Sequence, residues 1–422
     1  MFQVPRGTRD FTPEEMEKRR YVEKAMTSTF LSYGYGEIQT PTFENRELFT
    51  EKSGESILNE IYAFTDKGGR ELALRPELTA PVIRCYVERL QMEPKPLKLF
   101  YFGNCYRYDR PQKGRYREFR QAGCELIGVD TPEATAELLA LAYTLLQNVG
   151  LKNLTMNIGN LTIIGTILKR FNLDANQQKT LLPLIDKSQF DDLLIALQDC
   201  GVPESKASQF VDILQTNDIE EIREYVIDDP SAVQELTEME SILGLLKTSF
   251  QISNYVIKLG IVRGLDYYRG IVFEIDAPVL GAEKQLCGGG SYDLVSLFGG
   301  TAVPTAGFAV GFDRTILALE AESFTFPSQN LDVYVIPVNQ DMMTKTIEIV
   351  QQLRNHNLCA DFDQLRRGMV KSLKYAASRR VGKVIIVGPK DLEHHAVTLR
   401  DMKSGNQESI PLSEIFKKLK TP

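Results

Sequence analysis

Hydrophobic and polar positions follow two different periods along this chain of 422 residues, and changes of period divide it into segments. Up to about residue 162, helical and strand periods alternate, which predicts a sheet flanked by helices. From 163 to 250 the strand-type alternation disappears and helical periods dominate, which predicts a helical insertion. Residues 251–325 return to strands and turns, and a βαβ-type unit is predicted for 331–422.

Two local signals sharpen the prediction for the first segment. Thr12 followed by Pro13 and two glutamates is typical of a helix N-terminus, and the helix is expected to run to about Ser32. Further along, Pro41 interrupts a strand pattern. A proline cannot donate to a strand ladder, so this strand is expected at an edge or an interface.

The stretch from Phe100 to Leu126 reverses the sign of charge in a chain whose net charge is −7. Its pattern predicts two strands, about 99–108 and 116–127, joined by a basic turn. The middle of this hairpin holds more cations than acids, namely Arg107, Arg110, Lys113, Arg115, Arg117 and Arg120 beside Asp109 and Glu118. A charged hairpin that simply faces solvent is one interpretation of the pattern.

Side-chain alternation along the second strand supports another interpretation. One face of that strand would carry cations, an aromatic ring, an amide and a carboxylate, in the order Arg115, Arg117, Phe119, Gln121, Gly123 and Glu125. Such a strand face suits a ligand that is anionic at one end, planar in the middle and amine-like or imidazole-like at the other. ATP together with an amino acid fits this description. Glu77, where a strand gives way to a helix, is either a ligand-binding carboxylate or one that meets the helix dipole.

The composition narrows the class of protein. A hydrophobic content of 43% and a charged content of 25% are ordinary for a soluble globular protein. No apolar run approaches the roughly 20 residues of a membrane span, and the N-terminus has no apolar signal segment, so a cytoplasmic location is expected. The six cysteines contain no C-x-x-C pair, which argues against a structural zinc site and a disulfide framework.

Several catalytic classes are excluded from the main body. The only histidines are His356, His394 and His395, so a histidine base or an H-E-x-x-H zinc site before them is impossible. The sequence also lacks the P-loop and the G-x-G-x-x-G fingerprint in its strand-to-helix context. Any ATP would therefore be bound by arginines on an antiparallel sheet. Arg314, a cation in the first turn of a predicted helix, opposes the helix dipole and so favours an anionic ligand.

Charge is distributed unevenly between the segments. Residues 331–422 contain 15 Lys and Arg against 10 Asp and Glu, a net charge of +5, and the rest of the chain has a net charge of −12. This contrast favours a polyanionic partner for the C-terminal segment, although an ordinary α/β domain with mild asymmetry also fits. Residues 163–250 contain 16 acids and 7 bases, which argues against a general phosphate-binding surface there.

Four separated motifs resemble those of class II aminoacyl-tRNA synthetases, and specifically of histidyl-tRNA synthetases. They are, in order, RPELTAP, YRYDRPQKGRYREFRQAGCE, VRGLDYY and AGFAVGFDR. The resemblance covers nearly the whole chain. It implies an α+β fold with a class II antiparallel sheet flanked by helices, divided into a catalytic core (1–162 and 251–325), a helical insertion (163–250) and a C-terminal α/β anticodon-binding-type domain (331–422).

The resemblance also implies a reaction. L-Histidine would be activated by ATP to histidyl-adenylate and transferred to tRNA(His), giving histidyl-tRNA, AMP and diphosphate. The implied partners are histidine, ATP, Mg²⁺ with unassigned ligands, and tRNA(His) bound through the hairpin tip and the C-terminal domain. A homodimer is implied through the first helix and the strand that Pro41 interrupts.

Site residues follow position by position from the same motifs. The catalytic cations would be Arg107 and Arg263. Histidine would be bound by Glu77, Leu78, Thr79, Arg107, Gln121, Glu125, Arg263, Tyr267 and Tyr268. ATP would be bound by Arg107, Asp109, Arg115, Phe119 and Arg314. The acceptor end of the tRNA would meet Arg110 and Gln112.

Within these sets, the resemblance implies distinct roles. Arg107 would hold the α-phosphate and the histidine carboxylate, and Arg263 would act at the same α-phosphate. Glu77, Thr79 and Gln121 would fix the α-amino group, whereas Glu125 and Tyr268 would read the imidazole. Arg115 and Arg314 would meet the outer phosphates, and adenine would lie between Phe119 and Arg314.

Two departures and two rival interpretations stand beside this one. Ser291 stands where the family usually has an arginine, so the role of that family arginine is in doubt for this chain. Asp109 stands where many members of the family have a glutamate. A regulatory synthetase-like subunit of ATP phosphoribosyltransferase would resemble the core but typically lacks the C-terminal domain and the arginine of VRGLDYY. This chain has both. A purely RNA-binding module would leave the substrate positions unexplained.

Overall fold

The computed structural model describes residues 2–53, 55–109, 114–262, 268–327 and 331–420. The chain forms two compact units, Met1–Phe326 and Pro327–Pro422, and each is described by itself. Helix α1 (Pro13–Ser32) begins where the sequence predicts. The backbone N–H of Thr12 donates to Glu15 Oε2 at 2.7 Å, and the N–H of Glu15 donates to Thr12 Oγ1 at 3.4 Å, which closes a capping box.

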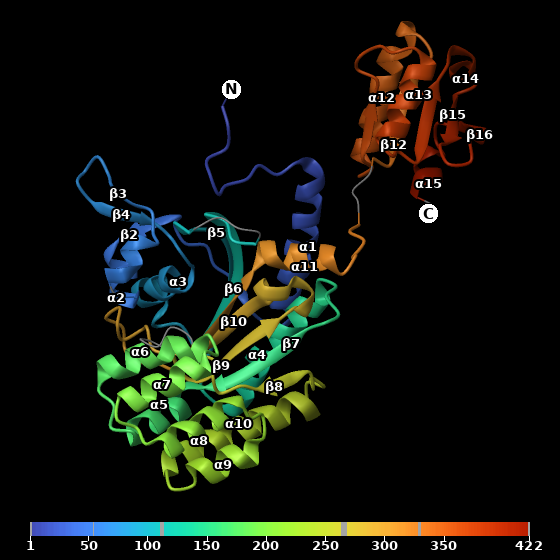
Figure 1. Cartoon of the computed structure of the whole chain (residues 1–422). Coiled ribbons are helices and arrows are strands. Elements are labelled where there is room, and N and C mark those ends of the chain that lie inside the picture. Colours follow the sequence, from blue (N-terminus) through green and yellow to red (C-terminus); the bar gives the residue numbers. More distant parts are fainter. Residues whose placement is uncertain (1, 54, 110–113, 263–267, 328–330, 421–422) are drawn as a thin grey trace. The chain divides into compact units, whose positions relative to one another are not determined.

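An eight-stranded sheet forms the centre of the first unit (Figure 1). In spatial order its strands are β1 (Gly36–Glu37), β5 (Leu97–Tyr106), β6 (Glu118–Ile127), β11 (Thr305–Gly311), β10 (Gln285–Tyr292), β9 (Tyr268–Asp276), β7 (Thr155–Asn160) and β8 (Tyr255–Ile257). All pairs from β5 to β7 are antiparallel, and only the short edge strands β1 and β8 join in parallel. The predicted antiparallel sheet is confirmed.

The two faces of this sheet have different covers. Helices α1, α4 (Pro132–Asn148), α10 (Pro230–Thr248) and α11 (Phe312–Ala321) form the main hydrophobic core with one face. In that core the ring of Phe30 stacks on Phe100 with 4.9 Å between centroids. On the other face, α3 (Thr79–Cys85) and its π-helical continuation η2 (Tyr86–Leu90) pack against the alternate residues of β5 and β6. Part of this second face stays open.

A smaller sheet lies beside α3. Its strands are, in spatial order, β2 (Phe43–Asn45), β4 (Glu71–Leu74) and β3 (Ala63–Thr65), with α2 (Glu47–Ser53) and η1 (Glu55–Asn59) between β2 and β3 in the sequence. The segment around Pro41 separates β1 from β2, as the proline predicts. Buried Arg75 holds this segment by donating to the carbonyls of Thr40 at 2.8 Å and Pro41 at 3.0 Å, and to that of Asn104 at 2.8 Å.

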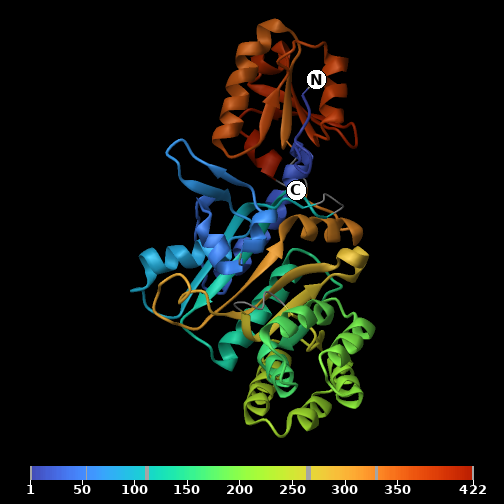
Figure 2. The same cartoon turned by 60° about the vertical axis from the view of Figure 1, so that its left-hand side comes forward.

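The predicted insertion is helical throughout. It consists of α5 (Leu161–Arg170), α6 (Ala175–Asp186), α7 (Phe190–Asp199), α8 (Glu204–Gln215), α9 (Ile219–Val226) and α10. These helices share a hydrophobic core of their own and gather at one side of the sheet (green in Figure 2). That core also includes Val272 of β9, so the insertion is joined to the sheet by packing as well as by the chain.

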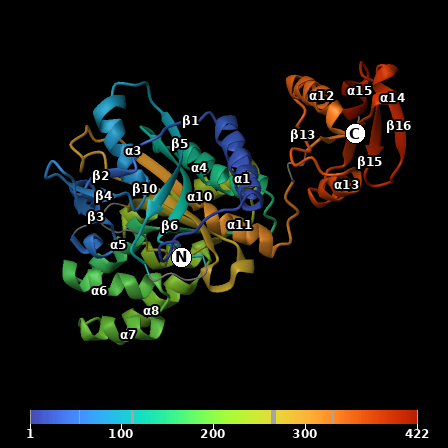
Figure 3. The same ribbon diagram turned by 90° about the horizontal axis from the view of Figure 1, so that it is seen from above.

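The second unit is an α/β sandwich (Figure 3). Its sheet has the order β13 (Ala360–Phe362), β12 (Val333–Pro337), β14 (Lys383–Val387), β15 (Ala396–Asp401) and β16 (Gln407–Pro411). Its helices are η4 (Gln340–Met342), α12 (Met343–Asn355), α13 (Met369–Ser378), α14 (Pro389–Glu393) and α15 (Ile415–Lys420). Val333 and Val335 pack with α12 and α15, whereas Tyr334 and Ile336 pack with α13, because successive strand residues face opposite sides.

Two strands, β15 and β16, precede the last helix α15, whereas the sequence pattern after the βαβ-type unit predicts one further strand and a short helix. The hairpin β15–β16 closes through a turn in which Gly405 has a φ of +78°. β16 was missed because its sequence, QESIP, is short and mostly exposed, so it has little hydrophobic alternation. No helix in the described parts of either unit combines the length and apolar character that crossing a membrane requires.

Arg75 offers a test of this arrangement. Replacing it in Arg75→Met is expected to lower the free energy of unfolding by about 3 kcal/mol, because three carbonyls, of which that of Thr40 is buried, lose their donor. Urea denaturation monitored by circular dichroism measures the change. Arg70→Met is the matched control, since the Arg70 side chain is 76% exposed. Equal unfolding midpoints for the two variants would contradict the prediction.

Candidate active site

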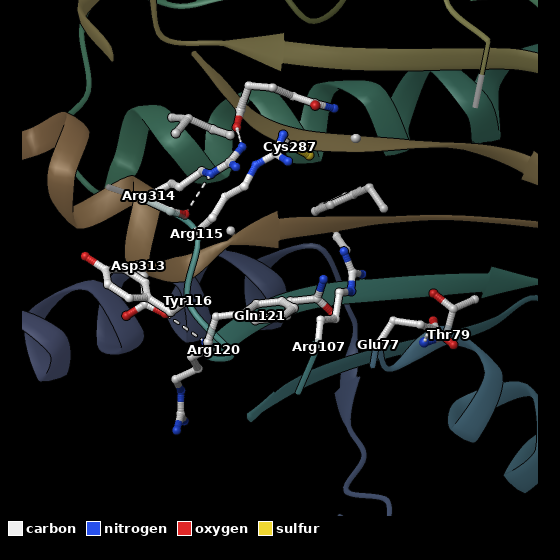
Figure 4. Close-up of a pocket in the computed structure, with 18 of the residues that line it drawn as sticks. Glu77, Thr79, Arg107, Arg115, Tyr116, Arg120, Gln121, Cys287, Asp313 and Arg314 are labelled. Atoms are coloured by element: carbon white, nitrogen blue, oxygen red, sulfur yellow. Dashed lines mark hydrogen bonds between the residues drawn. The ribbon is translucent and has the colours of Figure 1, made fainter. Parts of the chain in front are cut away.

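A pocket of about 520 Å³ lies over the open face of the sheet (Figure 4). Its walls come from β6, β9, β10 and β11, from the first turns of α3 and α11, and from residues around the hairpin turn. Most sequence-predicted residues that the structure describes meet here, namely Glu77, Thr79, Arg107, Asp109, Arg115, Phe119, Gln121, Tyr268 and Arg314. Segments far apart in the sequence therefore converge on one cavity.

Arg107 extends from the end of β5 across the pocket floor. Its Nε donates to the carbonyl of Pro76 at 2.9 Å, and its Cζ lies 5.2 Å from the ring centroid of Phe119. In the described part of the chain no carboxylate forms an ion pair with Arg107. The rest of its guanidinium thus remains available for an anion, and the Phe119 ring provides a flat apolar surface beside it.

Arg115 and Arg314 share one carboxylate at the opposite wall. Glu283, the last residue of η3 (Pro278–Glu283), lies 3.3 Å from Arg115 Nε and 2.7 Å from Arg314 Nη2. Arg314 also donates to the carbonyls of Gly114 at 3.2 Å and Gln285 at 3.0 Å. Burial lowers the pKa of Arg314, Glu283 raises it, and the neighbouring arginines lower it. The unfavourable position of Arg314 at the start of α11 is thus partly offset by Glu283.

Glu77 lies at the start of α3 and also lines the pocket, so both roles expected from its sequence position are possible. Its carboxylate accepts from the backbone N–H groups of Thr79 at 2.7 Å and Ala80 at 3.1 Å, as a helix-start residue does. It also pairs with Lys52 at 3.1 Å and lines the pocket. The side chain of Leu78, in contrast, is buried in the hydrophobic cluster beneath α3 and does not line the pocket.

Glu125 lies immediately behind the pocket wall, with 1% of its surface exposed. Tyr101 donates a hydrogen bond to its Oε1 at 2.9 Å, and Tyr292, which does line the pocket, donates to Oε2. Burial raises the pKa of Glu125 to about 7, while hydrogen bonds from Tyr292, Tyr101 and Thr79 oppose that rise. The carboxylate is therefore close to its point of ionisation at neutral pH.

Glycines make room for this buried carboxylate. A Cβ on Gly307 would lie 1.9 Å from Glu125 Oε2, and one on Gly123 would lie 2.6 Å from the Tyr101 hydroxyl. A Cβ on Gly289 would lie 2.2 Å from the carbonyl oxygen of Gly307. The triple glycine Gly288–Gly290 of β10 thus marks a close approach of backbones.

The predicted alternation holds for Phe119, Gln121 and Glu125 but is wrong for Arg117. The strand β6 begins only at Glu118, so the period of two does not extend back to Arg117. Arg117 leaves the pocket: its backbone N–H donates to the carbonyl of Gly7 at 2.8 Å, and its guanidinium lies 4.1 Å from the ring centroid of Tyr108.

Some predicted residues cannot be placed, and others were not predicted. Arg110, Gln112, Arg263 and Tyr267 lie outside the described residues. Several residues at the site were not predicted from the sequence, namely Lys52, Tyr101, Glu283, Tyr292 and Asp313. Alternation along β5 could have indicated Tyr101, whereas nothing local indicates that Lys52 reaches Glu77. Among the described residues, no group of three His, Cys, Asp or Glu side chains could hold a metal ion.

Comparison with known proteins agrees with this geometry. The family model described as histidyl-tRNA synthetase matches residues 7–315, and the model of the anticodon binding domain matches residues 332–421. The chain is 44% identical over 423 residues to the histidine–tRNA ligase of Methanocaldococcus jannaschii, covering 98% of this chain and 99% of that protein. It is 45% identical over 419 residues to that of Methanosarcina acetivorans, covering 98% of both.

Solved structures give the same result. The apo histidyl-tRNA synthetase of S. aureus superimposes with a TM-score of 0.76 at 30% identity, covering 100% of both chains. A structure from Bacillus halodurans described as an ATP phosphoribosyltransferase regulatory subunit/histidyl-tRNA synthetase has a TM-score of 0.79 at 27% identity, covering 92% of this chain and 98% of that one.

The pKa of Glu125 predicts how stability depends on pH. The folded state binds its proton more tightly than the unfolded state, so the free energy of unfolding should fall as pH rises from about 4.5 to about 7. The loss from this residue is on the order of 3 kcal/mol. Glu125→Gln removes the titrating group, so its stability relative to the parent should increase over that range. Urea denaturation at pH 5, 6, 7 and 8 measures this difference.

A control separates this effect from other titrating groups. Glu88→Gln changes a carboxylate whose side chain is 64% exposed, and it should keep the pH dependence of the parent. Parallel stability curves for Glu125→Gln and the parent would show that Glu125 ionises normally.

Proposed function

This chain belongs to the histidyl-tRNA synthetase family and charges tRNA with histidine, and we propose that the pocket over β6, β10 and β11 is where ATP and L-histidine react. The observation that carries this proposal is the polarity of the pocket. Three arginines line it, namely Arg107 on its floor and Arg115 and Arg314 on the facing wall, and the buried carboxylate of Glu125 lies behind another part of the wall. The phosphates of a nucleoside triphosphate would meet the arginines, and the imidazole of an amino acid would meet the carboxylate.

The reaction needs alignment and charge neutralisation. A carboxylate oxygen of histidine attacks the α-phosphorus of ATP, the new P–O bond forms histidyl-adenylate, and diphosphate leaves. The histidyl group then passes to the 3′ end of the tRNA with release of AMP. We propose that Arg107 binds both the histidine carboxylate and the α-phosphate, so that the attacking oxygen and its target are held together. Arg263 would stabilise the same phosphate.

The histidine end of the pocket would use hydrogen bonds. Glu77, Thr79 and Gln121 would bind the α-amino group, and Tyr268 would contact the imidazole with Glu125. Because Glu125 lies behind Tyr292, we propose that its charge acts on the imidazole through the Tyr292 hydroxyl. An amino acid without an imidazole would leave these buried polar groups unpaired, which penalises its binding. Leu78 would contribute only its backbone, and Tyr267 would lie on the same wall.

The nucleotide end would use the arginines. Arg115 and Arg314 would meet the outer phosphates, and the adenine would lie between Phe119 and Arg314. Asp109, which lines the pocket, would accept from the adenine amino group. Glu283 keeps the two arginines in place before ATP arrives, which lowers the cost of holding like charges close together.

Mg²⁺ would enter with ATP and would neutralise phosphate charge. Magnesium commonly binds through substrate phosphates, waters and one or two carboxylates, so it needs no cluster of protein ligands. Glu283 is the carboxylate at the arginine cluster that fits this role. The proposal therefore agrees with the absence of a three-ligand metal group among the described residues.

A homodimer in the cytoplasm completes the proposal. Phe43 and Phe64 are 52% and 41% exposed and form an edge-to-face pair at 6.3 Å on the small sheet. Such a pair suits a protein contact better than water. We propose that this surface and α1 meet a second copy of the chain.

The regulatory-subunit alternative has less support. It would not need an anticodon-binding domain, whereas residues 332–421 match one. The relatives from Methanocaldococcus jannaschii and Methanosarcina acetivorans, which match over 98% of this chain, are histidine–tRNA ligases.

The first test measures ATP–diphosphate exchange with each of the twenty amino acids separately. Exchange is expected with histidine alone, because only histidine satisfies the polar groups around Glu125. The relevant control is the reaction without amino acid, which reports contaminating activities. Absence of exchange with histidine, in the presence of Mg²⁺, would contradict the proposed chemistry.

The second unit carries a surface suited to the tRNA. Residues 364–390 contain eight Lys and Arg and no Asp or Glu. This stretch includes α13, on which Lys371 and Lys374 are exposed. Fully buried Asp363 anchors its beginning, since it accepts from the N–H of Arg367 at 2.5 Å and from the Ser372 hydroxyl at 2.9 Å. We propose that this basic surface meets the phosphates of the tRNA anticodon arm.

This surface generates a prediction about tRNA binding. The double variant Lys371→Ala/Lys374→Ala should raise the KM for tRNA roughly tenfold. It should also lower the slope of the logarithm of the binding constant against the logarithm of salt concentration by about two, one for each lost phosphate contact. Aminoacylation at 50 and 200 mM KCl measures both effects, and ATP–diphosphate exchange should not change. Lys345→Ala is the control, because the Lys345 side chain on α12 is 40% exposed. The surface would be the wrong one if the double variant behaved like Lys345→Ala.

A further inference from the structure

The segment before α1 packs against the active-site hairpin. The carbonyl of Gly7 accepts from the backbone N–H groups of Arg117 at 2.8 Å and Glu118 at 3.4 Å, where β6 begins. Gly7 has a φ of +86°, and a Cβ there would lie 2.7 Å from Arg117 Cγ. The chain can approach β6 this closely only with glycine at this position. The segment thus forms an outer support for the start of the strand.

Arg9 links this segment to two residues of the pocket wall. Its Nη2 pairs with Asp313 Oδ1 at 2.9 Å, and its Cζ lies 3.4 Å from the ring centroid of Tyr116. Both Asp313 and Tyr116 line the pocket. Asp313 directly precedes Arg314, and Tyr116 directly follows Arg115. Arg9 therefore contacts the neighbours of both arginines proposed to bind the outer phosphates.

Asp313 collects donors from several elements onto one carboxylate. In addition to Arg9, it accepts from Arg19 Nη1 of α1 at 2.5 Å and from the backbone N–H of Arg120 in β6 at 2.8 Å. Its side chain is only 6% exposed. Figure 4 shows Asp313 and Tyr116 side by side at one end of the pocket, with the hydrogen bond from Arg120 drawn.

We propose that Arg9 is a positioning residue for ATP. It holds the Tyr116 ring by stacking and Asp313 by its charge, and so fixes the part of the wall that carries Arg115 and Arg314. Arg115 needs such support because its side chain is 51% exposed and its recorded partner is Glu283. The inference rests on the proposed assignment of these arginines to ATP, and it extends the site to a segment outside the four motifs.

A merely structural role would have a different signature. If Arg9 only stabilised the fold, its loss would lower the melting temperature and the amount of active enzyme without favouring one substrate. A positioning role acts on the nucleotide end, since Arg9 contacts Asp313 and Tyr116, the neighbours of Arg314 and Arg115. The Michaelis constants for ATP and histidine therefore separate the two roles.

The test compares Arg9→Lys with Arg19→Lys in the full-length enzyme. Lysine can still pair with Asp313 but lacks the flat guanidinium that stacks on Tyr116. Arg9→Lys should raise the KM for ATP in ATP–diphosphate exchange roughly fivefold, the effect of losing one cation–π contact. The KM for histidine and kcat should stay within about twofold. Arg19→Lys keeps its pairing with Asp313 and touches Phe11 and Phe312 instead of Tyr116, so it should match the parent.

A second variant tests the same contact from the other side. Tyr116→Leu should raise the KM for ATP about as much as Arg9→Lys, and the double variant should add little, because both remove one interaction. An unchanged KM for ATP in Arg9→Lys would overturn the inference, and so would equal increases in the KM for ATP and the KM for histidine. In either case, ATP–diphosphate exchange by the parent enzyme would still support the proposed function. Absence of exchange by the parent would overturn the proposed function, and the inference with it.

Discussion

The architecture of the site depends on burying the carboxylate of Glu125 between three strands. β6 is paired with β5 on one side and β11 on the other, and the register places Gly123 opposite Tyr101 and Glu125 opposite Gly307. Neither glycine carries a side chain, so the Tyr101 hydroxyl and the Glu125 carboxylate fit into the space between the strands. Desolvation of a carboxylate is costly, and the hydroxyl donors of Tyr101 and Tyr292 offset part of that cost. The same register carries Phe119 and Gln121 to the pocket floor.

Carboxylates elsewhere in the site hold arginines in place. Glu283 joins Arg115 to Arg314, and Asp313 joins Arg9 to Arg19. Arginines this close repel one another, and burial of Arg314 adds to the cost. A structure selected for stability alone would not gather these charges at a cavity. The arrangement is favourable for a reaction in which phosphate charge must be bound and a diphosphate must leave.

In the proposed function, the two units bind different substrates. The first contains the pocket proposed for the small substrates, whose walls rest on the large sheet and its hydrophobic core. The second has a core on each face of a small sheet and carries the basic surface on α13. Under the proposed function, the tRNA would contact this surface of the second unit, whereas histidine would bind in the pocket of the first. The acidic insertion, in contrast, has no comparable density of cations.

Local patterns in the sequence determined much of this protein by themselves. The capping box of Thr12, the hairpin strands β5 and β6, the helical insertion and the motif residues that line the pocket all depend on neighbouring residues or on a family pattern. The tertiary structure alone decided which distant groups meet. Lys52 reaches Glu77, Tyr292 covers Glu125, Glu283 joins two arginines, and Arg117 leaves the predicted face because β6 starts at Glu118. Periodicity reports on which side of an element a residue lies, but a hydrogen bond or ion pair between segments depends on how those elements pack, and no local period encodes that.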